Sequence, residues 1–453
     1  MATSAIDDGF VLFNKLVGHR GQVLCIAAPD SKAAALIATG AEDSTVRLWD
    51  LRKGRGAAGS PGVAMCLCRC FDGEAVASVV FAPGGGNRLY CSAGGKVLEF
   101  DLRAGGGGLL VTSPTAVFDN DSEEVNELAV HPKGEYLAAA DDSGVVKVYS
   151  TRTRRVYKTL RNAHTSICHA VRFRPRTSWD LASGALDSTL VLWDFSTGRL
   201  RGKLDMTTFV GSSSTSSCSG QQLFNPPFVH SVDFTLDGRC LAAGLGDSGV
   251  VILDSKTRAS IGRCEGHTAP VSQVHYPCFN QEVLLSAGND QRLIFWDHRP
   301  FEQSQRGCAS QKISPASDGG NHRNSETGHG AVPLQNRKSH SSGKRKARAT
   351  KAAKGVSTPT VGLRGSHDTS VSQNQAQQEG AAEYCSTAKG GGEEGGGVRE
   401  GETRYPLITS SVPLSIMCLE EKPNWISSVS VPYDAILVAD TSSEAKILRR
   451  RGT

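Results

Sequence analysis

Hydrophobic positions recur along the chain in short runs separated by tight turns, and three such stretches align without gaps. They are LIATGAEDSTVRLWD (36–50), DLASGALDSTLVLWD (180–194) and VLLSAGNDQRLIFWD (283–297). Each stretch begins with an apolar run, passes through a turn that contains Asp, and ends a second apolar run in Trp-Asp. Runs of this length with turn residues between them predict pairs of antiparallel β-strands. We therefore expect an all-β repeat protein.

Four weaker units fill the intervals between the strong ones. They lack the Trp but keep turn aspartates, which we assign to Asp142, Asp247 and Asp440. These units cover residues 79–101, 128–149, 232–254 and 425–448. Seven units of four strands predict a seven-bladed β-propeller, whose closed ring leaves only short sheet edges. Because the last unit ends soon after its third strand, residues 10–13 are expected to supply its outer strand.

A long segment interrupts the pattern before the last blade. Residues 300–404 are rich in Gly, Ser, Gln and Lys, contain few aromatic residues and show no apolar periodicity, so we expect this insertion to be disordered. Residues 1–299 would then form blades one to six, with residues 10–13 closing blade seven. Residues 405–453 would supply the outer strand of blade six and the rest of blade seven.

Four residue types recur at fixed spacing in the three strong units. The step from Thr or Ser to Asp is four residues and the step from Asp to Trp is six in all three, with a His upstream. A buried Trp N–H needs an acceptor and a buried Asp needs donors, and a hydroxyl and an imidazole satisfy both. Because every strong unit repeats the set, we interpret it as a structural relay rather than a catalytic triad. Its members are His19, Thr39, Asp43, Trp49; His164, Ser183, Asp187, Trp193; and His267, Ser286, Asp290, Trp296.

This pattern resembles the WD-repeat family, whose members use the same positions as a buried hydrogen-bond relay. Longer stretches, among them RNAHTSICHAVRFRPR and NWISSVSVPYDAILVAD, are similar to the family of WD repeat-containing protein 53. The similarity covers most of residues 125–440 outside the loops, whereas blade one is closer to the general repeat. The resemblance implies a candidate substrate receptor of cullin-4 ubiquitin ligases.

A short motif, Trp-Asp-x-Arg, bears on that implication. WD-repeat receptors for the damaged-DNA-binding adaptor of cullin-4 ligases carry it, and the Arg is expected in the turn after the third strand, on the narrow bottom face. The planar fork of Arg suits bidentate pairing with carboxylates and backbone carbonyls. The alternative is a surface Arg that pairs with the Asp two residues before it. The motif and a near copy place Asp50, Arg52, Asp101, Arg103, Asp297 and Arg299 at the expected adaptor contact.

Charge is unevenly distributed along the chain. Residues 300–404 contain 15 Lys/Arg and 10 Asp/Glu, which accounts for the whole formal net charge of +5. The neutral propeller argues against direct nucleic-acid binding. Within the insertion, GKRKARATKAAKG (343–355) reads either as a nuclear-import signal or as a solvated cluster of linker charges. The signal would consist of Lys344, Arg345, Lys346 and Arg348, and we expect a nuclear and cytoplasmic location.

The remaining motifs point away from catalysis. The chain has 13 scattered Cys and no apolar run of the ~18 residues that a membrane span needs, so we expect a soluble, reduced, intracellular protein. Cys66, Cys68 and Cys70 share one strand face without a His nearby, which favours packing over metal binding. We expect no cofactor, metal, small-molecule substrate or membrane partner, and no enzymatic activity. The partners would be the ligase adaptor and an unknown client protein; alternatively, the chain is a complex or chromatin-associated scaffold with no ligase role.

Overall fold

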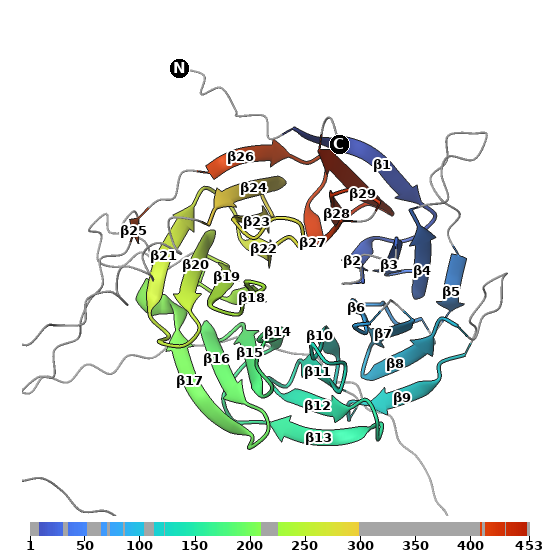
Figure 1. The fold of residues 1–453 in the computed structure, drawn as a ribbon, viewed down its shortest axis with the longest axis horizontal. Coiled ribbons are helices and arrows are strands. Elements are labelled where there is room, and N and C mark those ends of the chain that lie inside the picture. The colour runs from blue at the N-terminus through green and yellow to red at the C-terminus, as the bar shows by residue number, and fades with distance from the viewer. Residues whose placement is uncertain are drawn as a thin grey trace, which may run out of the picture. The chain divides into compact units, whose positions relative to one another are not determined.

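Seven antiparallel sheets stand around a central axis, and each places its first strand innermost (Figure 1). The computed structural model describes residues 9–29, 35–51, 65–69, 73–84, 87–103, 113–121, 123–209, 225–298, 408–409, 413–430 and 432–450. All of them belong to one compact unit, Met1–Ile313 with Thr403–Thr453. The prediction of a seven-bladed propeller is confirmed.

Blades one to four follow the chain in order. Blade one contains β2 (Val23–Ala27), β3 (Leu36–Ala41), β4 (Thr45–Asp50) and β5 (Met65–Arg69). Blade two contains β6 (Ser78–Phe81), β7 (Arg88–Ala93), β8 (Lys96–Asp101) and β9 (Ala116–Asp119). Blade three contains β10 (Val125–Val130), β11 (Tyr136–Asp141), β12 (Val146–Ser150) and β13 (Arg155–Leu160). Blade four contains β14 (Cys168–Phe173), β15 (Asp180–Ala185), β16 (Thr189–Asp194) and β17 (Arg199–Asp205), which a short 3-10 helix, η2 (Met206–Phe209), follows.

Blades five to seven include strands that are distant in sequence. Blade five contains β18 (Val229–Phe234), β19 (Cys240–Leu245), β20 (Gly249–Asp254), β21 (Ser260–Glu265) and β25 (Ile408–Thr409). Blade six contains β22 (Val271–His275), β23 (Val283–Gly288), β24 (Arg292–Asp297) and β26 (Pro413–Cys418). Blade seven contains β27 (Pro423–Val429), β28 (Ala435–Asp440), β29 (Glu444–Arg450) and β1 (Phe10–Val17).

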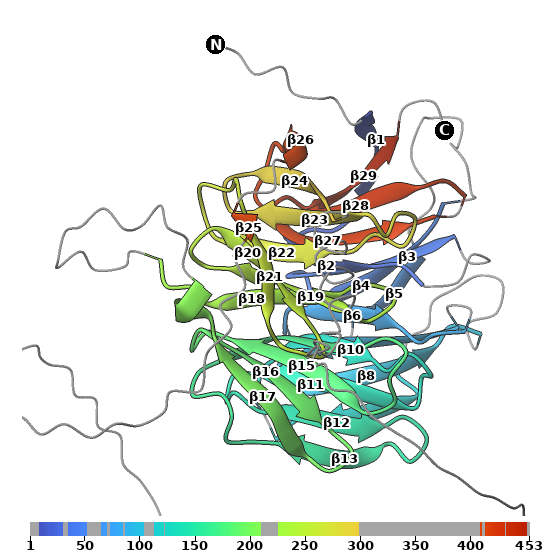
Figure 2. The ribbon, with the colours of Figure 1, turned by 60° about the vertical axis from the view of Figure 1, so that its left-hand side comes forward.

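The N-terminal strand closes the ring. β1 pairs antiparallel with β29, from Phe10 opposite Arg450 to Val17 opposite Glu444, and both views show the two strands side by side (Figure 2). Phe10 is buried and its ring lies 5.5 Å from that of Phe295 in blade six. Residues 10–13 therefore lie in the outer strand of the last blade, where the sequence placed them.

The segment after blade six departs from the expected organisation in one respect. β26 pairs with β24, so the third and fourth strands of blade six are neighbours although the insertion separates them in sequence. Before it, however, β25 pairs in parallel with β21 of blade five, through Gly262 opposite Ile408. Residues 405–453 therefore contribute to three blades rather than two, and residues 300–404 lie outside the described part of the chain.

Close packing between neighbouring blades depends on a glycine in the second strand. At Gly40, Gly184 and Gly244, an added Cβ would come closer than 3.0 Å to a Val side chain on, or just before, the innermost strand of the next blade. All six residues of β19, which contains Gly244, are buried. A side chain at these positions would push adjacent sheets apart, because protein interiors are close-packed.

Candidate protein-interaction site

The bottom face is the face of the ring at which the first and third strands of each blade end. Because neighbouring strands of a blade run antiparallel, the turns from first to second strand and from third to fourth strand share this face. Asp101, the last residue of β8, and Arg103 in the turn that follows therefore lie on the bottom face, as the motif predicts.

Arg103 is held by its own Asp. Its side chain is 64% exposed. Nε and a terminal nitrogen donate to the two carboxylate oxygens of Asp101 at 2.9 and 2.6 Å. These side-chain bonds, with a further bond from the Arg103 backbone N–H, hold the pKa of Asp101 down to about 2. This is the local pairing that the sequence left as the alternative to a partner contact.

The same Asp position organises the turn in other blades. Asp194 Oδ1 accepts bonds from the backbone N–H and the hydroxyl of Ser196, at 3.1 and 2.6 Å. Asp254 Oδ1 accepts one from the Lys256 backbone at 2.8 Å, as Asp101 does from the Arg103 backbone at 3.0 Å. An Asp that ends the third strand thus fixes the residue two positions later, which in blade two is Arg103.

The other predicted contact residues, the cysteines and the import residues lie as follows. Asp50 and Asp297 end β4 and β24, and Asp50 is buried. Arg52, Arg299, Cys70 and the import residues Lys344, Arg345, Lys346 and Arg348 lie outside the described residues. Cys66 and Cys68 belong to β5.

The four relay residues of blade one are in contact. Trp49 Nε1 donates to Thr39 Oγ1 at 2.9 Å, and that hydroxyl lies 2.7 Å from His19 Nε2. His19 Nδ1 lies 3.1 Å from both oxygens of Asp43. Because the indole can only donate, the Thr39 hydroxyl accepts from it and donates to Nε2. The His19 proton is then on Nδ1, directed at Asp43.

Blades four and six repeat this arrangement. In blade six, Trp296 Nε1 and His267 Nε2 both lie 2.8 Å from Ser286 Oγ, and His267 Nδ1 lies 2.9 Å from Asp290. In blade four, Trp193 Nε1 and His164 Nε2 lie 2.8 and 2.7 Å from Ser183 Oγ. There His164 Nδ1 is 3.5 Å from Asp187 and 3.0 Å from the Thr189 hydroxyl, which itself donates to Asp187.

Burial sets the charge states of the relays. It lowers the pKa of His19, His164 and His267 more than the neighbouring carboxylates raise it, so these rings are neutral. Burial opposes the charged form of Asp43 as well, but bonds from Thr45 and the Arg20 backbone outweigh it and lower the pKa.

Blade three replaces the relay with different residues. Tyr149 occupies the Trp position; its hydroxyl donates to Asn120 Oδ1 at 2.8 Å, and Asn120 Nδ2 donates to Asp141 at 3.0 Å. Asp141, not Asp142, also accepts the Ser143 turn bonds. Asp142 instead accepts a bond from the Asn126 side chain, so our assignment of the turn aspartate in this blade was wrong.

Blades five and seven pair the aspartate with a cation from one of their own outer strands instead of with a His. Arg263 pairs with Asp247 at 2.9 Å, and both side chains are buried. In blade seven, buried Lys446 donates to buried Asp440. In blades five and seven a cation of the same blade therefore satisfies the aspartate, as a buried carboxylate requires.

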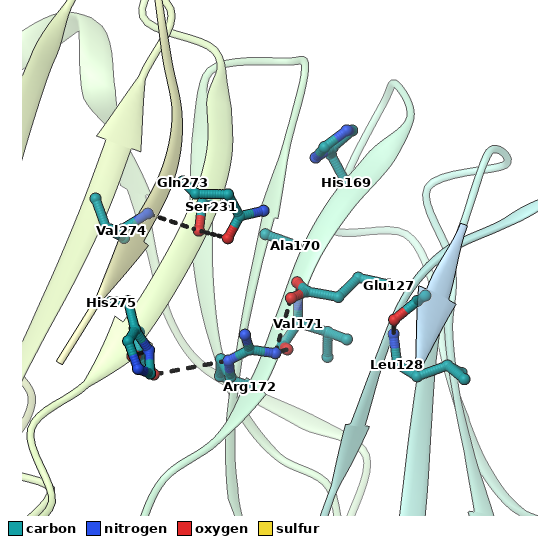
Figure 3. Close-up of polar contacts among 12 residues, drawn as sticks. Glu127, Leu128, His169, Ala170, Val171, Arg172, Ser231, Gln273, Val274 and His275 are labelled. Atoms are coloured by element: carbon teal, nitrogen blue, oxygen red, sulfur yellow. Dashed lines mark hydrogen bonds and ion pairs between the residues drawn. The ribbon is translucent and has the colours of Figure 1, made fainter. Parts of the chain in front are cut away.

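The innermost strands carry a polar belt that the sequence analysis did not find. It consists of one residue from each of five consecutive blades: Glu127, Arg172, Asp233, His275 and Ser428. Arg172 points toward Glu127, 2.7 Å away (Figure 3). It also lies 3.6 Å from Asp233. Asp233 accepts a 3.0 Å contact from His275 Nδ1, and His275 Nε2 lies 2.8 Å from the Ser428 hydroxyl.

Burial determines the charge state of Glu127 in this belt. It raises the pKa of Glu127 to about 7, although Arg172 acts in the opposite direction. Arg172, Asp233 and His275 hold the same position in three successive inner strands, so an alignment of those strands alone would have exposed the alternating charges. Glu127 also accepts a bond from the Val171 backbone, and Ser231 one from the Val274 backbone, which ties neighbouring blades together (Figure 3).

A cavity of about 550 Å³ opens where the inner strands end, at the bottom mouth of the channel. All seven blades line it. Arg172, Asp233 and His275 form a charged side, whereas the positions equivalent to them in blades one to three are Ala27, Val80 and Ala129. The cavity can take a protruding side chain from another protein, with apolar contacts on one side and ionic contacts on the other.

Two observations concern the described residues only. Within these ranges, no group of three or more His, Cys, Asp or Glu is placed to hold a metal ion. A search of the same residues finds no helix that is long and apolar enough to cross a membrane.

Comparisons with known proteins agree with this architecture. The family model "WD domain, G-beta repeat" matches residues 10–50, 112–150, 155–194 and 258–297. The chain is 30% identical over 303 residues to WD repeat-containing protein 53 homolog of Dictyostelium discoideum, covering 63% of this chain and 78% of that protein. It is 26% identical over 279 residues to THO complex subunit 3 of Arabidopsis thaliana, covering 61% of this chain and 75% of that protein.

A solved structure extends the likeness to the fold. The WD40 β-propeller domain of Doa1 superposes with a TM-score of 0.57 at 11% identity, with 98% of each chain covered. WD40 propellers generally serve as protein-interaction scaffolds and are usually not catalytic. On its repeats, its relays and these relatives, the chain belongs to the WD40-repeat β-propeller family.

Proposed function

We propose that this propeller is the substrate receptor of a cullin-4–RING ubiquitin ligase. Its bottom face would bind the damaged-DNA-binding adaptor through the Trp-Asp-x-Arg motifs, and its opposite face would bind a client protein. The chain itself would perform no catalysis. The observation that carries the proposal is the position of Arg103, exposed on the bottom face directly after the third strand of blade two.

The Asp101–Arg103 pair suits a binding role. Exposed ion pairs contribute little stability, so Arg103 can exchange Asp101 for a partner carboxylate or carbonyl at small cost. The bond from the Arg103 backbone N–H to Asp101 would remain after such an exchange and would keep the turn in place. Arg52 follows the third strand of the adjacent blade, and we propose that it enters the same groove.

The test is the double substitution Arg52→Ala and Arg103→Ala. Loss of two arginine anchors is expected to weaken adaptor binding by about 30-fold or more, equivalent to about 2 kcal/mol. The thermal midpoint should stay nearly constant, because surface changes usually alter stability by less than ~0.5 kcal/mol. Binding is measured by surface plasmon resonance on purified adaptor. Adding Arg299→Ala to the double variant should weaken binding little further, because blade seven separates blade six from blade one.

Arg239→Ala provides a matched control. Arg239 is 66% exposed and pairs with Asp237, two residues before it, at 3.2 Å, but it lies in blade five. It should leave adaptor binding unchanged. Full binding by the double variant would contradict the receptor role.

The alternative is a scaffold with no ligase role. It is favoured by the fork of Arg103 being occupied by its own Asp101. The similarity to a protein named as a THO complex subunit also supports membership of some other assembly. Under this alternative the double variant would behave like wild type.

We also propose that the basic run within residues 343–355 directs nuclear import. The observation is the density of cations, Lys344, Arg345, Lys346 and Arg348 within five positions. Replacing all four by Ala should abolish nuclear accumulation of a fluorescent fusion. Unchanged accumulation would leave the run as linker charge.

A further inference from the structure

A second cavity opens on the bottom face between blades four and five. Its volume is about 330 Å³. Its polar wall residues come from the turns of these two blades and from β15 and β17, and Trp193 and Phe234 lie among its apolar ones. The polar residues are Arg174, Asp180, Arg201, Ser255, Lys256 and Arg258.

Positive charge exceeds negative charge in this wall. Four cationic side chains and one carboxylate line the wall, and Asp180 is shared by Arg174 at 3.4 Å and Arg201 at 3.1 Å. Arg201 also pairs with Asp194, which does not line the cavity, at 3.3 Å. Lys256 and Arg258 take part in none of the ion pairs found among the described residues; Arg258 donates instead to the Arg201 backbone carbonyl. The cavity therefore holds cations that its own residues do not neutralise.

Ser255 supplies the second observation. The residue is only 7% exposed, and its hydroxyl has no hydrogen-bond partner within the described structure. A buried hydroxyl normally finds a partner, and leaving it unpaired costs about as much as a lost hydrogen bond. Because Ser255 lines the cavity, a ligand acceptor that enters it is a natural partner for this hydroxyl.

The charge and donor set fit a phosphate monoester. Such a group carries a charge of about −1.5 to −2 at neutral pH and has three strong acceptor oxygens. Guanidinium groups bind these oxygens as paired donors, the Lys256 ammonium as a point charge, and a hydroxyl fills a remaining position. A carboxylate offers one charge and two oxygens, fewer than this wall can satisfy.

An exposed aromatic surface adjoins the cavity on the side of blade three. Trp179, which precedes the wall residue Asp180, is 39% exposed, and so is Tyr157; Leu200, opposite Trp193 in the sheet, is 47% exposed. Large aromatic side chains at this exposure are typical of surfaces that bind peptides. The surface would receive the residues that flank a phosphorylated one.

We propose that the cavity between blades four and five binds a phosphorylated serine or threonine of a protein partner. The inference goes beyond the ligase proposal, because the adaptor contact is assigned to blades one and two. Either can therefore fail while the other stands.

The test uses a fluorescein-labelled degenerate peptide pool with one central phosphothreonine, its unphosphorylated counterpart, and inorganic phosphate as competitor. Fluorescence polarisation should show at least tenfold tighter binding of the phosphorylated pool, and inorganic phosphate should displace it. Ser255→Ala should weaken that binding several-fold, and the double variant Lys256→Ala, Arg258→Ala should weaken it at least tenfold.

Two controls separate recognition from folding. Ser255→Ala removes no hydrogen bond seen in the structure, so its thermal midpoint should equal or exceed that of wild type. Arg155→Ala removes an exposed cation of blade three that does not line the cavity and should leave binding intact. Equal binding of both pools, unchanged binding by Ser255→Ala and the double variant, or binding of inorganic phosphate without preference for the phosphorylated pool would overturn the proposal.

Discussion

Replacing Trp193 by alanine is expected to lower the free energy of unfolding by about 3–5 kcal/mol, the usual range for a large buried aromatic side chain. Trp193 is 3% exposed, and its indole donates to the Ser183 hydroxyl. The substitution would leave a cavity among the residues of blades three and four that pack around it. It would also remove one partner of a buried polar chain that continues through His164 to Asp187.

Chemical denaturation with urea measures the change. Trp179→Ala provides the matched control, because this Trp belongs to the same blade but is 39% exposed. It should cost clearly less than Trp193→Ala, because a larger part of its side chain already contacts solvent and its removal leaves no buried cavity. Equal stability of Trp193→Ala and wild type would refute the structural role of the relay.

Acidification from pH 7 to pH 5 is expected to destabilise the propeller by at least about 2 kcal/mol. Burial lowers the pKa of His230 and His298 to about 4, from an ordinary value of 6.5. Below pH 6.5 the unfolded chain takes up these protons and the folded chain does not. Each buried neutral ring therefore makes its full contribution to the free energy of unfolding above pH 6.5. By pH 5 that contribution has fallen by about 2 kcal/mol.

Glu127 opposes this loss. Because burial raises its pKa to about 7, the folded chain takes up its proton between pH 7 and pH 5, which stabilises the fold by about 2 kcal/mol. Together, His230, His298 and Glu127 are expected to lower the free energy of unfolding by about 2 kcal/mol between pH 7 and pH 5. Further histidines with lowered pKa values act in the same direction as His230: His19, His131, His164, His169 and His267.

Urea unfolding at pH 7, 6 and 5 tests the sign. The Glu127→Gln variant cannot take up the stabilising proton. Its free energy of unfolding should therefore fall between pH 7 and pH 5 by about 2 kcal/mol more than that of wild type. A free energy of unfolding that is constant or rises toward pH 5 would show that the histidines are not buried as neutral rings.

The sequence predicted those parts of the fold that repeat. Three units with the same four residues at the same spacing identified the blades, and the short last unit placed residues 10–13 in the outer strand beside β29. The polar chain of blade three was harder to predict, because Tyr149, Asn120 and Asp141 form it in place of the Trp, hydroxyl, His and Asp of the other blades. Which of two successive aspartates caps its turn depends on strand register, which the local sequence does not specify.

Non-local contacts were beyond the sequence. β25 pairs with β21 through only two residues, Ile408 and Thr409, and its parallel pairing has no local signal. The polar belt draws single residues from five blades, so its contacts become visible in the sequence only when the inner strands are aligned with one another. The cavity around Ser255 likewise depends on the spacing between two blades. For the adaptor contact, the motif predicted Arg103 on the bottom face and left open whether its side chain pairs with Asp101, as it does in the structure.

We propose that the bottom face of blades one and two binds the damaged-DNA-binding adaptor. Amide hydrogen exchange of the full chain, alone and saturated with purified adaptor, tests it most directly. The proposal predicts slower exchange in the turns after β4 and β8, which contain Arg52 and Arg103, and unchanged exchange in the turn between β18 and β19 around Arg239. No protection after β4 and β8, or protection confined to the opposite face, would contradict it.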